Sequence, residues 1–145
     1  MSWFNYYGLI FIAIIMTPNI VFAITNRDGF KNKYKNKLLE ISEQIGRYAC
    51  IVLTIFNIPY TYFNFWFEYA LPIYLFVNGA LCLMYLLFWI VFWNRDGKLK
   101  ALLLSIIPSA FFLFSGVVVA SIPLIAFALL FGITHILLSY KNSVN

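Results

Sequence analysis

Charged residues are scarce in this chain of 145 residues. Only 10% of the residues are charged, whereas 63% are hydrophobic, and a water-soluble domain is about a quarter charged. A globule of this length that buried all of its apolar side chains would have too little polar material to cover its surface. The scarcity of charge therefore excludes a water-soluble domain and indicates that lipid surrounds most of the chain.

Segments that alternate apolar and polar residues are also missing. Backbone groups in lipid must be hydrogen-bonded internally, which leaves helices or a closed barrel. Barrel strands alternate over about ten residues, but the apolar runs here are about twenty residues long, the length of a spanning helix. The sequence predicts an all-α fold, a polytopic helical bundle in the membrane. We expect a single domain over residues 1–145, because no segment is long and polar enough to form a second one.

Motifs of catalysis and metal binding are absent from the chain. It has no P-loop, no G-x-S-x-G, no H-E-x-x-H and no dinucleotide fingerprint. The two cysteines, Cys50 and Cys82, fall inside apolar runs without a C-x-x-C or histidine-rich pattern, which favours packing residues over a disulfide or a metal site. We expect no metal and no cofactor, and these absences favour a protein that is not an enzyme.

The apolar runs predict five membrane spans, at about residues 3–25, 45–63, 69–93, 99–119 and 122–140, with a basic loop at 26–44. No cation precedes the first run, which therefore reads as a retained span and not as a signal peptide. The last two spans divide one apolar stretch, 101–139, which as a single helix would be about 58 Å long, too long for tilt to absorb. Ser121 as an N-cap and Pro123 in a first turn predict the break. Four spans with one long broken helix are the alternative.

Lysine and arginine are confined almost entirely to two islands. Six of the ten lie between Arg27 and Arg47, three lie between Arg95 and Lys100, and only Lys141 lies elsewhere. Cations in short loops stay in the cytoplasm. We therefore expect a multi-pass protein of the cell membrane with its N-terminus outside and its C-terminus cytoplasmic. Four spans would place Lys141 outside, which is an argument for five.

Both islands open with Asn-Arg-Asp-Gly, at residues 26–29 and 94–97. Gly29 and Gly97 can take the left-handed conformation that ends a helix, and the arginines can reach lipid phosphate. A duplicated two-span unit is the alternative, because internal repeats are common in transporters. The two halves align poorly beyond these four residues, so we favour two independent helix stops.

The first basic loop predicts contact with anionic lipid headgroups, which attract such a cluster by about 1 kcal/mol per cation. We expect no nucleic-acid partner, because no larger basic surface or fold presents one. A helical pattern begins at Leu38 and predicts an extension of the second span along the membrane surface, with Glu43 and Arg47 as an i,i+4 pair. Five short helices enclose little interior, so a second copy or a partner in a membrane complex is also expected.

Polar residues within or near the spans define the candidate site. His135 is the one clear ionisable candidate inside a span, where such groups are functional by default. No second histidine or carboxylate in the membrane accompanies it in the sequence, which favours a histidine bonded to a neighbouring helix over a proton relay or metal site. Pro18 disrupts the first span and leaves Asn19 in need of a partner. The predicted polar cluster of the cytoplasmic leaflet comprises Asn19, Arg27, Asp28, Glu43, Arg47, Asn94, Arg95, Asp96 and His135.

Three functions are compatible with these features. The first hypothesis is a small membrane protein that is not an enzyme and that binds or transports a small solute, or is an accessory subunit of a membrane complex. The second is an enzyme of the cytoplasmic face that acts on lipid or isoprenoid phosphates, with arginines binding phosphate and His135 as acid or base. The third is a holin-like or immunity-type membrane protein.

Overall fold

Five helices make up the part of the chain that the structure, a computed structural model, describes: residues 4–25, 37–56, 68–93 and 98–144. In chain order they are α1 (Tyr6–Thr25), α2 (Lys37–Ile55), α3 (Ala70–Val91), α4 (Lys98–Val119) and α5 (Ile122–Val144). Within these residues the only extended pairing is one isolated bridge between Phe4 and Phe56. The all-α prediction is confirmed.

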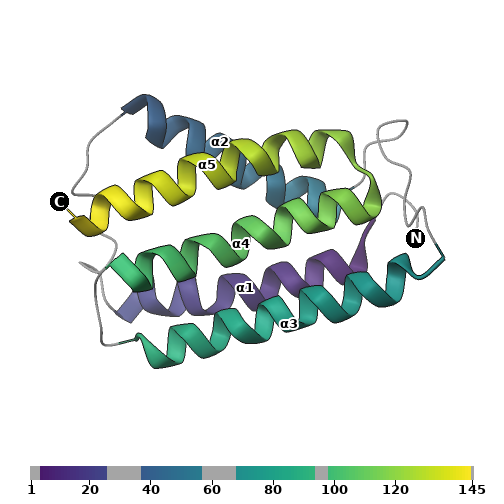
Figure 1. Ribbon diagram of the computed structural model, residues 1–145, viewed down its shortest axis with the longest axis horizontal. Coiled ribbons are helices and arrows are strands. Elements are labelled where there is room, and N and C mark those ends of the chain that lie inside the picture. Colours follow the sequence, from purple (N-terminus) through teal and green to yellow (C-terminus); the bar gives the residue numbers. More distant parts are fainter. Residues whose placement is uncertain (1–3, 26–36, 57–67, 94–97, 145) are drawn as a thin grey trace.

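The helices lie side by side in one bundle (Figure 1), and the contacts between them close into a ring. α1 packs against α3, α3 against α4, α4 against α5, α5 against α2, and α2 returns to α1. The C-terminal ends of α1, α3 and α5 and the N-terminal ends of α2 and α4 lie at the same end of the bundle, on the left in Figure 1. We call this the basic end, because Lys37, Lys98, Lys100 and Lys141 all belong to the helix segments there.

The turn between α4 and α5 explains why the long apolar stretch is two helices. Ala120 has a φ of 54°, and the amides of Ala120 and Ser121 donate to the carbonyls of Val117 and Gly116 at 3.1 and 2.9 Å. These two bonds close the end of α4 in the manner of a Schellman motif. Ser121 then caps α5, because its Oγ accepts a bond from the Leu124 amide at 3.4 Å. The predicted break and the predicted cap are confirmed.

The surface of the bundle is apolar and its interior is partly polar. On α2 an exposed stripe of large side chains, most of them apolar, follows the helical period: Leu38, Ile41, Ile45, Tyr48 and Val52. Phe76 and Ile90 on α3 are 79% and 73% exposed. Buried polar residues include Asn5, Thr54, Asn78, Ser105, Ser115, Ser121 and Thr134. This distribution is the reverse of that in a soluble protein, where polar residues cover the outside.

Three of the helices are long and apolar enough to cross a membrane: Ala70–Val91, Leu99–Val119 and Ile122–Lys141. Tyr6–Phe22 forms a shorter apolar helix. Together with the apolar surface, these lengths indicate a membrane protein, because a helix needs about 20 apolar residues to cross the hydrocarbon core.

The helices differ from the predicted spans mainly at α2. This helix begins at Lys37, eight positions before the predicted span 45–63, so the helical pattern seen from Leu38 is confirmed. Residues 57–63 of that span lie outside the described residues. α3 falls within the predicted 69–93, and α1 starts at Tyr6, three positions after the predicted start of span one.

Both cysteines are free and buried. Cys50 lies on the inner face of α2, and Cys82 lies on the inner face of α3 with its Sγ 4.0 Å from the carbonyl oxygen of Phe11. Their role as packing residues is confirmed, because the two are unpaired and both face neighbouring helices.

Candidate functional site

A buried carboxylate lies where α2 crosses α5. Glu43 is only 4% exposed and shares the inner face of α2 with Gly46, Cys50, Leu53 and Thr54. A Cβ at Gly46 would lie 3.0 Å from backbone and Cβ atoms of Phe131 on α5, so the two helices cross closely at this glycine. Glu43, one turn earlier on the same face, is thereby held against α5.

Two basic side chains meet on one oxygen of this carboxylate. Arg47 donates to Glu43 Oε1 from Nε at 3.0 Å and from Nη2 at 2.5 Å. His135 Nδ1, on α5, lies 3.3 Å from the same Oε1. The predicted i,i+4 pair is confirmed. Charge-assisted hydrogen bonds of this kind are about twice as strong as neutral ones, which is how a carboxylate can be buried here.

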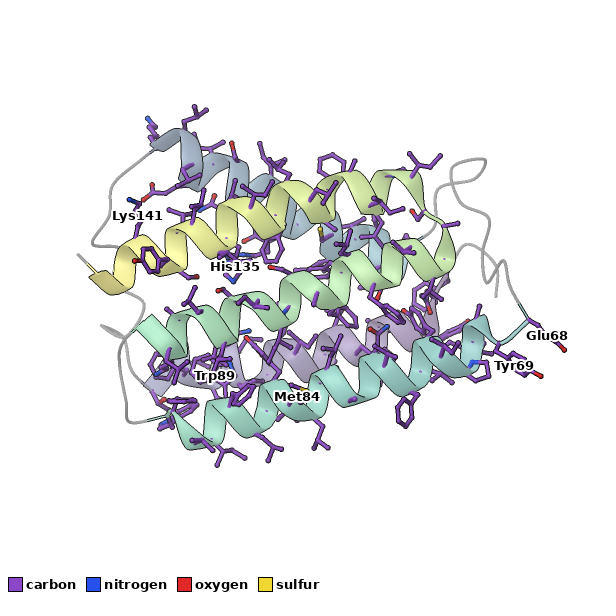
Figure 2. The ribbon with its side chains drawn as sticks, in the orientation of Figure 1. Glu68, Tyr69, Met84, Trp89, His135 and Lys141 are labelled. Carbon is purple, nitrogen blue, oxygen red and sulfur yellow. The ribbon has the colours of Figure 1, made fainter. Side chains whose placement is uncertain are left out.

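His135 lies on the inner side of α5, in the half of the bundle that leads to Lys141 and the basic end (Figure 2). The Phe131 ring stacks on its imidazole with the ring centroids 4.6 Å apart. The contact with Glu43 fits the interpretation of His135 as a histidine bonded to a neighbouring helix. The sequence did not predict Glu43 as its partner, because Glu43 precedes the second predicted span, but the inner face of α2 brings it to α5.

The charge state of Glu43 follows from these neighbours. Glu43 precedes the apolar run of α2. Burial alone would raise the pKa of its carboxyl group, but the hydrogen bond with His135 and the positive charge of Arg47 together outweigh burial, and the pKa lies below its ordinary value. Glu43 is therefore ionised at neutral pH, as a carboxylate paired with an arginine should be.

Two further polar residues join the site from α1 and α3. Tyr85 donates its hydroxyl hydrogen to Asn19 Oδ1 at 2.9 Å, and Asn19 Nδ2 donates to the Ile15 carbonyl at 3.1 Å. The Arg47 guanidinium is near enough for its charge to act on the Tyr85 hydroxyl. We call these five residues from four helices the Glu43 site: Asn19, Glu43, Arg47, Tyr85 and His135.

Tyr85 is the member of the site that sequence reasoning missed. It belongs to a buried row on one face of α3, at helical spacings of four, four, three and four: Tyr74, Asn78, Cys82, Tyr85 and Trp89. The signal was available, since side chains at these spacings share one side of a helix. Only the facing helix, however, identifies Asn19 as the partner.

A second polar network occupies the opposite half of the bundle. Asn5 caps α1, because its Oδ1 accepts a bond from the Gly8 amide at 3.0 Å, and its Nδ2 donates to the Tyr74 hydroxyl at 3.1 Å. Asn78 Nδ2 donates to Ser115 Oγ at 3.1 Å and links α3 to α4. These groups carry no charge, and they join helices as polar side chains do in membranes. Asn78 therefore forms an interhelical contact.

The predicted cytoplasmic cluster is thus assembled in part. Arg47 and His135 both contact Glu43, and Asn19 bonds to Tyr85, whose hydroxyl is near enough to be affected by the charge of Arg47. The other five predicted members lie outside the described residues: Arg27, Asp28, Asn94, Arg95 and Asp96.

The site offers proton exchange and ion pairing. Within the described residues no group of three or more His, Cys, Asp or Glu side chains could hold a metal ion. Comparison with protein-family models, with curated proteins and with solved structures finds no match for this chain. The function must therefore be inferred from the chemistry of the site itself.

Proposed function

We propose that the chain is a multi-pass protein of the cell membrane with five spans. α3, α4 and α5 meet the length and composition of spanning helices. α1 and α2 run alongside them in the same ring (Figure 1) and complete five crossings. The exposed apolar stripe on α2 supports this assignment, because such a stripe is suited to lipid and not to water.

The basic end is proposed to face the cytoplasm. The first island follows α1 in the sequence and continues into α2, and the second follows α3 and continues into α4, and these helix ends all lie at the basic end (Figure 1). Lys141 belongs to the same end, whereas Glu68 lies at the other (Figure 2). Positive charge is retained on the cytoplasmic side, which places the N-terminus outside and the C-terminus inside. The same cations are proposed to contact anionic lipid headgroups.

The proposed activity is the binding of a small polar solute at the Glu43 site, either to carry it across the membrane or to present it within a larger membrane complex. The observation that supports it is the burial of Glu43 between Arg47 and His135. Burying a carboxylate is costly even when it is paired, and ionisable groups within a membrane bundle mark functional sites by default.

A lipid-phosphate enzyme is less well supported. It would need Arg47 to bind phosphate bidentately, but two of the Arg47 donors are already used on Glu43. The remaining arginines of that hypothesis, Arg27 and Arg95, lie outside the described residues.

Solute binding can be tested by the thermal unfolding of the purified protein in an uncharged detergent. A ligand that binds the folded state raises the unfolding temperature. Solutes of each charge class would be compared: acetate, tetramethylammonium, acetamide and inorganic phosphate. We expect one class to stabilise the native protein and to lose this effect in Glu43→Gln.

The matched control is Glu68→Gln, which removes an exposed carboxylate at the opposite end of the bundle and should respond as the native protein does. Uptake of the stabilising solute into proteoliposomes would then be measured for His135→Ala and Asn19→Ala. Stabilisation by no solute, or equal stabilisation of the native protein and Glu43→Gln, would refute a binding site at Glu43.

A further inference from the structure

The Glu43 site contains one histidine, the side-chain type that can gain or lose a proton between about pH 5 and 8. Glu43 and Arg47 form a pair with no net charge, and both Arg47 and His135 contact Oε1 of the carboxylate. With Nδ1 of His135 donating to Glu43, Nε2 is an acceptor in the neutral imidazole and a donor in the protonated one. Protonation of His135 therefore changes the net charge of the site from zero to plus one.

The surroundings of His135 hold one further carboxylate, Glu40 of α2, whose Oε1 is buried without a hydrogen-bond partner among the described residues. α5 packs against α2 and α4. From α2 come Glu43 and Arg47, with Glu40 one turn nearer the basic end. From α4, Ser109 lies closest to this part of α5, with its Cβ 3.5 Å from the position of a Cβ on Gly132, and it is neutral.

The remaining charged and titratable groups point elsewhere or bring no negative charge. Lys100, in the first turn of α4, has its ammonium over the rings of Phe22 and Trp89, toward α1 and α3. Lys141 lies further along α5 at the basic end. Tyr85 on α3 uses its hydroxyl hydrogen on Asn19. Apart from Glu40, the described residues around His135 therefore bring no negative charge beyond that of Glu43.

Several polar atoms of the site make no hydrogen bond with the described residues. Two of them are donors: Nη1 of Arg47 always donates, and Nε2 of His135 donates when the imidazole is protonated. The third is an acceptor, Oε2 of Glu43. The Arg47 and His135 side chains are 39% and 23% exposed, so neither is sealed inside the bundle. Two cationic donors side by side match the oxygens of one anion, and the lysines of the basic end raise the local anion concentration.

From this geometry we infer that the ligand is a small monoanion, such as a carboxylate, that binds together with one proton held on His135. The inference rests on the proposed solute site and specifies its substrate class. The anion contacts Arg47 and the protonated Nε2 of His135, and the proton comes from the surrounding water. Binding of the two is reciprocal, because each raises the affinity for the other by the same factor. Release of the proton leaves a neutral site that no longer attracts the anion.

The test measures the affinity for acetate and for nitrate, from thermal unfolding, between pH 5.5 and 8.5 at constant ionic strength in sodium sulfate. Above the range in which a histidine titrates, the affinity of the native protein should fall about tenfold per pH unit, the slope for one linked proton. His135→Gln, which stays neutral, should abolish the slope. Lys141→Gln removes a cation of the basic end outside the site and should keep the slope.

A second measurement needs no variant. Calorimetric titration of the native protein with acetate, in two buffers of different ionisation enthalpy, should report the uptake of about one proton per anion bound at pH 7.5. Uptake of no proton, or an acetate affinity that is independent of pH, would overturn the inference. Stabilisation by tetramethylammonium or acetamide, lost in Glu43→Gln, would also overturn it but leave the solute site intact. Stabilisation by no solute would refute both.

Discussion

At the scale of single residues, the carboxylate of Glu43 organises one half of the bundle. One of its oxygens accepts from Arg47 and lies 3.3 Å from Nδ1 of His135. Because the Arg47 side chain is 39% exposed, water can rehydrate it when the pair is broken. The pair should therefore contribute less than a fully buried one, whose disruption costs about 3–5 kcal/mol.

We expect Glu43→Gln and Arg47→Gln each to lower the free energy of unfolding by about 1–3 kcal/mol, the range for hydrogen bonds to charged groups. The double variant should lose less than the sum, because each single variant leaves the other charge unpaired. Unfolding in sodium dodecyl sulfate, followed by circular dichroism, measures the three values. Strictly additive losses would show that the two side chains do not interact.

The same pair gives a pH dependence with a defined sign. Since the pKa of Glu43 in the folded protein lies below the ordinary value of 4.5, its contribution is complete at neutral pH. The contribution of Glu43 is lost as the pH falls below 4.5 and through the lowered pKa of the folded protein, because the carboxylate must then take up a proton.

At the scale of helices, small residues decide where the elements cross. Gly46 brings α2 onto the backbone of α5, and Gly8 brings α1 close to Thr54 of α2, at the end opposite the basic one. Gly79 on α3 has nothing within 4 Å of the position of a Cβ. Gly46 and Gly8 therefore allow close crossings, as small residues do between membrane helices. Gly79 does not lie at a close crossing.

Gly46→Ala and Gly79→Ala should therefore have opposite effects. The methyl group at Gly46 meets Phe131 at 3.0 Å, so α2 must move away from α5 and the contact of Glu43 with His135 must lengthen. We expect a lower unfolding temperature and loss of solute stabilisation. Gly79→Ala should be neutral or stabilise by up to about 1 kcal/mol, through helix propensity alone. Equal behaviour of the two variants in thermal unfolding would contradict a close α2–α5 crossing.

The turn between α4 and α5 contains a residue in an unfavourable conformation. Ala120 has a φ of 54°, a region that costs a residue with a Cβ about 1–2 kcal/mol. Ala120→Gly should raise the free energy of unfolding by about 1 kcal/mol, reduced from the upper value by the greater entropy of glycine in the unfolded chain. Ala120→Val should lower it. Both are measured by the same denaturation experiment, and a destabilising glycine would contradict the left-handed turn.

At the scale of the whole molecule, the ring of five helices separates its charges by end. Lysines of α2, α4 and α5 meet at one end, whereas Glu68 lies at the other (Figure 2). Each helix runs antiparallel to the one before it, so the start of α1 and the end of α5 lie at opposite ends of the bundle (Figure 1). If all five helices cross the membrane, as proposed, these two ends lie on opposite sides of it.

The proposed topology predicts that a reporter fused after Asn145 is active only in the cytoplasm. A reporter inserted next to Glu68, between α2 and α3, should be active only outside. Alkaline phosphatase, which folds outside the cytoplasm, and a fluorescent protein, which matures inside, provide the paired readouts. A reporter after Asn145 that is active outside would refute five spans or the assigned orientation.

Much of the fold could be predicted because lipid imposes simple rules on a chain. Apolar runs of a given length must form helices there, and Ser121 and Pro123 mark a helix start by local bonding alone. The site was harder to predict. Polar residues in or near the predicted spans indicated four members of the site: Asn19, Glu43, Arg47 and His135. They did not indicate Tyr85, and they did not predict a carboxylate beside His135.

The sequence by itself determined the helical class, the break after Val119 and the separation of basic from apolar segments, since these follow from the composition and from interactions between near neighbours in the chain. Only the tertiary structure decided that Glu43 faces His135 and that Tyr85 bonds to Asn19. Such contacts join residues of different helices, and they depend on which face each helix presents and on how closely Gly46 lets α2 approach α5. Helix packing determines both, and no local pattern in the sequence encodes them.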